Sequence, residues 1–142
     1  MRILGIDYGR KRIGLAVSDP LYITAQALPT LHRGDAENDM AALEVLIRER
    51  EVDEVVVGLP KNMDGSLGAS AREALAFADE LRARFQLAVH MVDERLSTSR
   101  AHKAMKSAGL TRKKRTESAD KVAAQLILQS YLDQRGQRGQ RG

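Results

Sequence analysis

The sequence contains no cysteine and no tryptophan, and its aromatic side chains are three tyrosines and two phenylalanines. Without cysteine the chain can form no disulfide, no thiolate metal site and no cysteine nucleophile. Any bound metal must therefore be held by carboxylates, histidine or water. This ligand set favours hard cations such as Mg2+ or Mn2+.

Long apolar runs are also missing, since no stretch approaches the roughly 18 apolar residues of a membrane span. The opening residues MRILGIDYGRKR lead directly into a strand-like pattern without the order of a signal peptide. We therefore expect a cytoplasmic protein with no membrane partner. The length suits one domain, placed at residues 1–133, and the Gln-Arg-Gly repeats at 134–142 are expected to be a disordered tail.

Charge is distributed unevenly along the chain. Residues 1–94 carry 11 basic and 16 acidic side chains, whereas residues 95–142 carry 12 basic and 3 acidic ones. The overall net charge of +4 hides this asymmetry. A basic block beside an acidic one is typical of a surface that receives a polyanion, although a solubilising tail would give the same count.

Periodicity divides the chain into alternating strands and helices. The first two strands are separated by a segment too short for a parallel crossover, which fits a hairpin, and Pro29 limits the third strand to an edge or an end. The pattern predicts an α/β fold, a five-stranded mixed sheet with helices on both faces. The expected strands lie at residues 3–7, 13–17, within 23–31, around 55–57 and at 87–92. The first helix is expected to begin after Asp35 as its N-cap, and the other helices are expected to cover 71–85, 97–108 and 117–133.

Acidic residues stand where the first and last strands are expected to end. Asp7 ends the first strand, and Gly9 behind it lets backbone or substrate approach closely. Asp93 and Glu94 end the last strand, and alternation allows only one of them to face a given side. The other acid of the pair would lie next to the metal ligand without binding the metal itself. Taken singly, each acid could equally cap a turn or end a strand in solvent.

Asp120 lies on the last expected helix. A helical wheel places it at the edge of an apolar arc that should face the sheet, with Gln125 and Gln129 on the other side. A carboxylate turned toward a core needs a cation or hydrogen bonds, although an acid near a helix N-terminus is also stabilised by the helix dipole. Asp120 is therefore the third candidate ligand.

Together these acids predict a metal site. Asp7, Glu94 and Asp120 would offer carboxylate oxygens to one or two Mg2+ or Mn2+ ions, the arrangement used for two-metal hydrolysis of phosphodiesters. Such chemistry needs no serine or histidine nucleophile. The three histidines show no metal-ligand spacing.

Four motifs follow one another along the chain. They are GIDYG with RIGLAVSD (residues 5–9 and 12–19), VGLP with NMDGS (57–60 and 62–66), DERLST (93–98), and DKVAA with ILQSYL (120–124 and 127–132). In this order they resemble the YqgF family, also known as the RuvX-type Holliday junction resolvases or pre-16S rRNA nucleases, of ribonuclease H-like fold. The resemblance covers nearly the whole chain and leaves out only the Gln-Arg-Gly repeats.

This resemblance implies that the family's metal-binding acids fall on Asp7, Glu94 and Asp120, the positions that the residues themselves suggest. It also implies a bacterial cytoplasmic hydrolase that matures the 5′ end of 16S ribosomal RNA. Holliday junction resolution in DNA is the alternative role that the family implies.

Basic residues near the acids are candidates for holding nucleic acid. The segment 109–116 is expected to be a linker just before the helix of Asp120, so its cations could bind a phosphate backbone without reading sequence. With so few aromatics, specific base reading is not expected, and structured RNA would be selected by shape. Each residue could instead be a solvated surface charge. The candidates are Lys61, Arg95, Arg112, Lys113, Lys114 and Arg115.

Two other classes fit parts of the pattern. An ATPase of the actin and sugar-kinase type also begins with a strand, an Asp-x-Gly turn and a hairpin, but it needs a second domain. A non-catalytic nucleic-acid-binding module would be expected to have lost at least one acid. Between RNA and branched DNA, the lack of a self-complementary apolar stripe favours RNA and a monomer or weak homodimer, since a resolvase must cut symmetrically as a dimer.

Overall fold

A computed structural model describes the backbone of residues 1–94 and 112–141, with side chains for 1–94 and 122–136. The helix expected at 97–108 lies outside the described residues. The other expected elements are present, all but the last helix within a few residues of their expected bounds. They are β1 (Arg2–Tyr8), β2 (Arg12–Ser18), β3 (Ala25–His32), α1 (Ala36–Glu49), β4 (Val52–Leu59), α2 (Ala69–Phe85), β5 (Ala88–Asp93) and α4 (Arg112–Arg141).

The five strands form one mixed sheet in the order β3-β2-β1-β4-β5, as the sequence predicts. β1 pairs antiparallel with β2 and parallel with β4, and β5 continues the parallel half. β3 is an edge strand, in agreement with its Pro29. Its register against β2 shifts between Leu31 and Leu28, so that the segment with the proline bulges out of the ladder.

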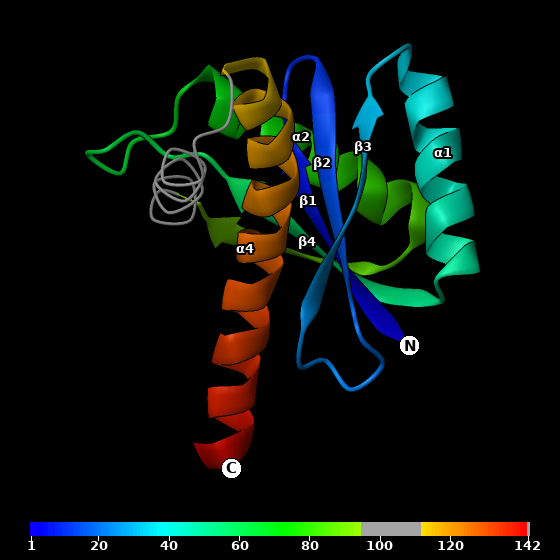
Figure 1. The fold of residues 1–142 in the computed structure, drawn as a ribbon, viewed down its shortest axis with the longest axis vertical. Coiled ribbons are helices and arrows are strands. Elements are labelled where there is room, and N and C mark those ends of the chain that lie inside the picture. The colour runs from blue at the N-terminus through cyan, green and yellow to red at the C-terminus, as the bar shows by residue number, and fades with distance from the viewer. Residues whose placement is uncertain (95–111, 142) are drawn as a thin grey trace.

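Helices α1 and α2 cover one face of the sheet (Figure 1). α1 begins at its expected cap, where the Asp35 side chain accepts a hydrogen bond from the Asn38 backbone nitrogen. The apolar residues of both helices then recur at helical spacing and meet alternate residues of the strands. This core includes Leu4, Ile6, Val55, Val57, Met40, Leu43, Phe77 and Leu81.

α4 covers the opposite face and packs unusually close to β1. A Cβ added at Gly5 would lie 2.7 Å from the Cβ of Leu128 and 3.2 Å from the Ala124 carbonyl oxygen, so the absence of a side chain at Gly5 sets the helix-to-sheet distance. The core on this face contains Ile3, Ala16, Val56, Ala124, Ile127, Leu128 and Leu132. Helices therefore lie on both faces, which confirms the predicted fold class.

Two glutamines of α4 lie differently from the expectation. Gln125 donates to the Ala25 carbonyl, while Gln129 accepts from the Ala25 nitrogen and donates to the Ile23 carbonyl. The expectation that both face away from the sheet is wrong, because the helix lies beside the open edge of β3. The two side chains supply hydrogen bonds that an edge strand would otherwise make with water.

α4 is also longer than expected at both ends. It begins at Arg112, so residues 112–116 are helical rather than part of a linker, in keeping with the good helix propensity of lysine and arginine. It continues through Arg141, so the tail expected to be disordered is helical from 134 to 141. Arg135 anchors this extension, with its guanidinium 3.1 Å from Glu54 and over the Tyr22 ring.

No helix among residues 1–94 and 112–141 is long and apolar enough to cross a membrane.

The close packing at Gly5 gives a stability prediction. Gly5→Ala forces a Cβ against the backbone and side chains of α4, so it should lower the free energy of unfolding by about 1–3 kcal/mol, measured by urea titration. Gly34→Ala is the matched control, because a Cβ at Gly34 meets nothing within 4 Å. Equal stability of the two variants would show that α4 does not approach β1 this closely.

Candidate active site

Asp7 stands near the carboxyl end of β1 and faces α4. Gly5 and Ile3, two and four residues earlier, contribute to the core beneath that helix, so alternation carries the Asp7 side chain to the same face. The side chain is half-buried. Its cross-strand neighbour on β2 is Gly14, which has no side chain to cover it.

Glu94 follows β5 and reaches the same face. Its backbone nitrogen donates to the Leu59 carbonyl at 3.2 Å, which holds it beside the end of β4. Its Oε2 is buried. A Cβ added at Gly58 would overlap this oxygen and would lie 2.6 Å from Cδ1 of Ile127. The carboxylate therefore occupies the space that a side chain on β4 would otherwise fill.

The sheet register brings the two acids together. Ile6 of β1 lies beside Val57 of β4, and the next residues along these parallel strands are Asp7 and Gly58. Because Glu94 lies over Gly58, both carboxylates lie at the carboxyl edge of the sheet, under the same helix. The role of Gly58 was missed from the sequence, where it was only a strand-ending glycine.

Register also separates the adjacent acids Asp93 and Glu94. Val92 packs against the α4 core, so Glu94 returns to that face, whereas Asp93 is exposed and belongs to the alternate position of the strand. Glu94 is thus the one of the pair that lies with Asp7.

Asp120 lies within α4, four residues before the fully buried Ala124, and its side chain is outside the described set. The described residues alone contain no group of three or more metal-ligating side chains, a group that would here require Asp120 as its third member.

Gly9 serves the turn after β1. A Cβ at Gly9 would lie 2.6 Å from the Arg12 carbonyl oxygen, so the missing side chain lets the backbone of the turn pack closely against Gly9. Tyr8 beside it stacks on Phe77, with ring centroids 4.1 Å apart. Burial raises the pKa of the Tyr8 phenol, and nearby Arg33 opposes that rise.

The predicted nucleic-acid contacts divide into described and undescribed residues. Lys61 follows β4 at the edge that carries Asp7 and Glu94, in a loop fixed by hydrogen bonds of Asn62 and Asp64 with Ser66. Residues 112–115 form the first turn of α4, and their side chains, like Arg95, lie outside the described residues. Figure 1 shows this turn and the β1–β2 turn at the same end of the molecule, away from both termini.

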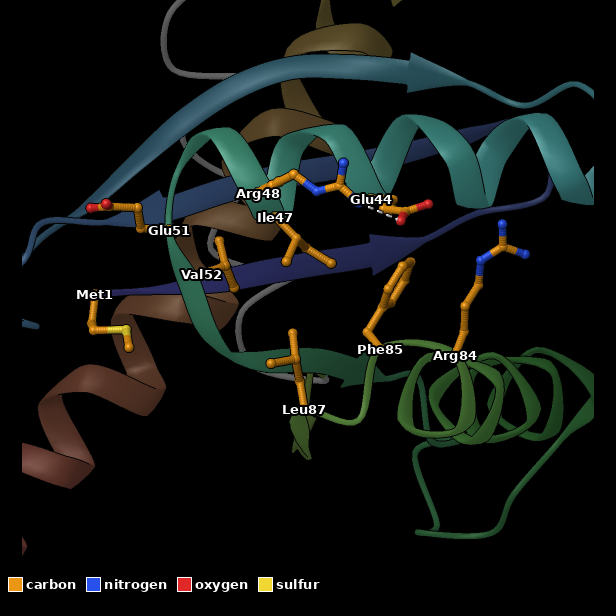
Figure 2. A pocket seen from close by; sticks show the side chains of 9 residues that line it. All are labelled: Met1, Glu44, Ile47, Arg48, Glu51, Val52, Arg84, Phe85 and Leu87. Carbon is orange, nitrogen blue, oxygen red and sulfur yellow. Dashed lines mark hydrogen bonds and ion pairs between the residues drawn. The ribbon is translucent and has the colours of Figure 1, made fainter.

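A cavity of about 580 Å³ lies elsewhere, between the C-terminal ends of α1 and α2 and the beginning of β4 (Figure 2). Its apolar lining comes from Met1, Ile47, Val52, Phe85 and Leu87, and one of its two glutamates, Glu44, is paired with Arg48. Because it borders the starts of the parallel strands, it lies at the opposite edge from Asp7 and Glu94. Residues at the carboxyl ends of such strands are the usual site residues, so the cavity is not the candidate active site.

Comparison with known proteins identifies the family of the chain. Residues 1–134 match the family model RuvX, described as Holliday junction resolvase. A protein of Moorella thermoacetica named "Putative pre-16S rRNA nuclease" is 51% identical over 139 residues, covering 98% of this chain and 99% of that protein. A relative of the same name from Clostridium acetobutylicum is 48% identical over 133 residues, covering 94% and 98%.

Solved structures show the same fold. The Thermus thermophilus RuvC structure with a Holliday junction substrate has a TM-score of 0.56 at 18% identity, covering 96% of each chain. The fowlpox virus resolvase with Holliday junction DNA has a TM-score of 0.55 at 12% identity, covering 94% of this chain and 98% of that one. The fold is ribonuclease H-like, and the class is nuclease. The chain belongs to the RuvX family.

The space over Gly58 can be tested directly. Gly58→Ala places a methyl group where the Glu94 carboxylate and Ile127 lie, so displacement of the acid should slow cleavage by roughly 10²-fold. Gly68→Ala is the control at the same edge, because its Cβ would come no nearer than 3.4 Å to Asn62. Wild-type cleavage by Gly58→Ala, with both variants folded by circular dichroism, would contradict this placement.

Proposed function

We propose that this protein is a metal-dependent nuclease that hydrolyses phosphodiester bonds in precursor 16S rRNA, with Asp7, Glu94 and Asp120 as its metal-binding carboxylates. The observation that carries the proposal is the placement of Glu94 over Gly58, which the register sets beside Asp7, on the face of the sheet covered by α4. Asp120 completes the set because it lies on that helix. Its part in the site rests on sequence and on its place in α4.

The residues present suit a hard divalent cation. Carboxylate oxygens are the ligands that Mg2+ and Mn2+ prefer, and the glycines beside Asp7 and beneath Glu94 leave the carboxylates uncovered by side chains of the neighbouring strands. A bound divalent cation supplies Lewis-acid activation of water and stabilises negative charge on phosphate oxygens. The chain's own part is to hold the carboxylates at fixed positions on rigid strands.

RNA is favoured as the substrate because relatives near 50% identity, covering almost the entire chain, are named for precursor 16S rRNA. An RNA-processing role places the protein in the cytoplasm and allows it to act as a monomer or weak homodimer. The family description supports the alternative, resolution of Holliday junctions in DNA. A resolvase would have to cut two strands symmetrically, which requires a two-fold dimer.

Cleavage of two labelled substrates tests the function. Wild-type protein with Mg2+ or Mn2+ should cut a precursor 16S 5′ leader, and Asp7→Asn, Glu94→Gln and Asp120→Asn should each abolish cutting while binding is retained. Asp93→Asn, which changes the neighbouring acid on the other side of β5, should keep more activity than Glu94→Gln. Paired symmetric cuts in a four-way DNA junction, with the RNA left intact, would establish the resolvase instead. Binding without metal-dependent cutting of either substrate would leave a non-catalytic module.

Metal binding can be measured without cleavage. A ligand that binds only the folded state raises Tm, so MgCl2 or MnCl2 should raise the Tm of the wild type in a concentration-dependent way. Asp7→Asn should lose most of that increase. Glu49→Gln is the control, since it removes one exposed carboxylate at the end of α1. Equal increases in Asp7→Asn and wild type would remove Asp7 from the metal site.

A further inference from the structure

The turn between β1 and β2 is held in one conformation by a single arginine. Arg33 donates from Nη1 to the carbonyl oxygens of Gly9 at 2.9 Å and Arg10 at 3.1 Å. Its backbone nitrogen donates to the Lys11 carbonyl oxygen at 2.9 Å. The Gly9 nitrogen closes the turn on the Arg12 carbonyl at 3.0 Å. Three consecutive carbonyl groups of the turn are therefore bonded to Arg33.

Arg33 is in turn fixed by both helices on its face of the sheet. Its guanidinium lies over the Tyr8 ring, 4.6 Å from the centroid, and Tyr8 stacks on Phe77 of α2. Its Nε lies 3.9 Å from the carboxylate of Asp39 on α1, which is only 7% exposed. The turn is thus ordered before any ligand arrives, which lowers the entropic cost of binding there.

This rigid turn carries two exposed cations that pair with no acid in the described part of the chain. Arg10 and Lys11 are exposed, and no carboxylate of the described residues lies within ion-pair distance of either. By contrast, Arg48, Arg82 and Arg84 on the two helices are each paired with a glutamate or aspartate. The charge of the turn is therefore available to an anion from solution.

The β1–β2 turn lies beside the carboxylates of the candidate site. Arg10 follows Asp7 by three residues, so the turn flanks the carboxylates on the β2 side. Lys61, at the end of β4, lies on the other side of Asp7 in the sheet order. Carboxylates repel a polyanion, so cations on both sides of Asp7 would help to hold its backbone across this edge of the sheet.

We infer that Arg10 and Lys11 form a phosphate-binding site, in which both cations contact backbone phosphates of the nucleic-acid strand that crosses Asp7 and Glu94. Arg33 is a positioning residue that holds this turn and does not touch the strand. The inference rests on the proposed function, since it assigns a second contact surface to the same substrate.

The test compares binding of a fluorescent single-stranded RNA leader across a salt series, with Asp7→Asn in every protein so that the RNA stays intact. Replacing Arg10 and Lys11 together by alanine should weaken binding and reduce the slope of log K against log salt by about 1.4, or about 0.7 for each lost phosphate contact. Arg48→Ala with Arg50→Ala removes the same charge at the opposite end of the molecule and should leave the slope unchanged.

Arg33→Ala separates positioning from contact. It should weaken binding several-fold while keeping the full slope, because the phosphate contacts still form but the turn must first be ordered. Unchanged affinity in Arg33→Ala would remove its positioning role. A reduced slope in that variant would make Arg33 a phosphate contact itself.

Failure of this inference is distinguishable from failure of the proposed function. If the protein with intact Asp7 cuts the leader but the Arg10 and Lys11 variant keeps the parent slope, only the phosphate site of the turn is overturned. The same conclusion follows if the Arg48 and Arg50 control loses as much slope. If the protein with intact Asp7 neither binds nor cuts nucleic acid, the proposed function itself fails. All variants are first compared in unfolding midpoint, which should not change for the exposed residues.

Discussion

The missing side chains at Gly5 and Gly58 are the constraint on which the rest of the molecule depends. They lie on β1 and β4, the two central parallel strands under α4, and each faces that helix. Gly5 allows Leu128 to reach the sheet, and Gly58 leaves room above β4 for both Ile127 and the Glu94 carboxylate. Because close packing transmits small displacements, the depth of α4 and the position of the acid are linked. The same contact that buries the core therefore fixes the site.

The charges of the protein follow the same layout. Acids lie at the carboxyl edge of the parallel strands, and exposed cations of the β1–β2 turn and Lys61 lie at that edge on both sides of them. Away from this edge, several arginines are tied into ion pairs, as with Arg135 and Glu54 or Arg48 and Glu44. A single edge thus combines carboxylates that can hold a metal with cations that can hold phosphate. Metal-dependent hydrolysis of phosphodiesters can use that combination.

The strands, their hairpin and the Asp35 cap could be predicted because each depends on periodicity or on a local hydrogen bond. Alternation also predicted that only one of the two acids ending the last strand faces a given side of the sheet. The strand register then showed that Glu94 is the acid on the α4 side. The roles of Gly58, Gln129 and Arg33 could not be predicted. Each depends on segments distant in the sequence meeting at one point, and neither propensity nor spacing reports such a meeting. The family resemblance implies the three acids as metal ligands but does not show what holds Asp7 and Glu94 in place.

The central claim is that Asp7 and Glu94 form one metal site over Gly58, completed from α4. The most direct measurement is anomalous diffraction at the manganese edge from crystals of the full chain grown with MnCl2. We predict an anomalous peak at the carboxyl edge of β1, β4 and β5, within coordination distance of oxygens from Asp7, Glu94 and Asp120. Manganese bound only at other carboxylates, with these three turned away from one another, would contradict the account.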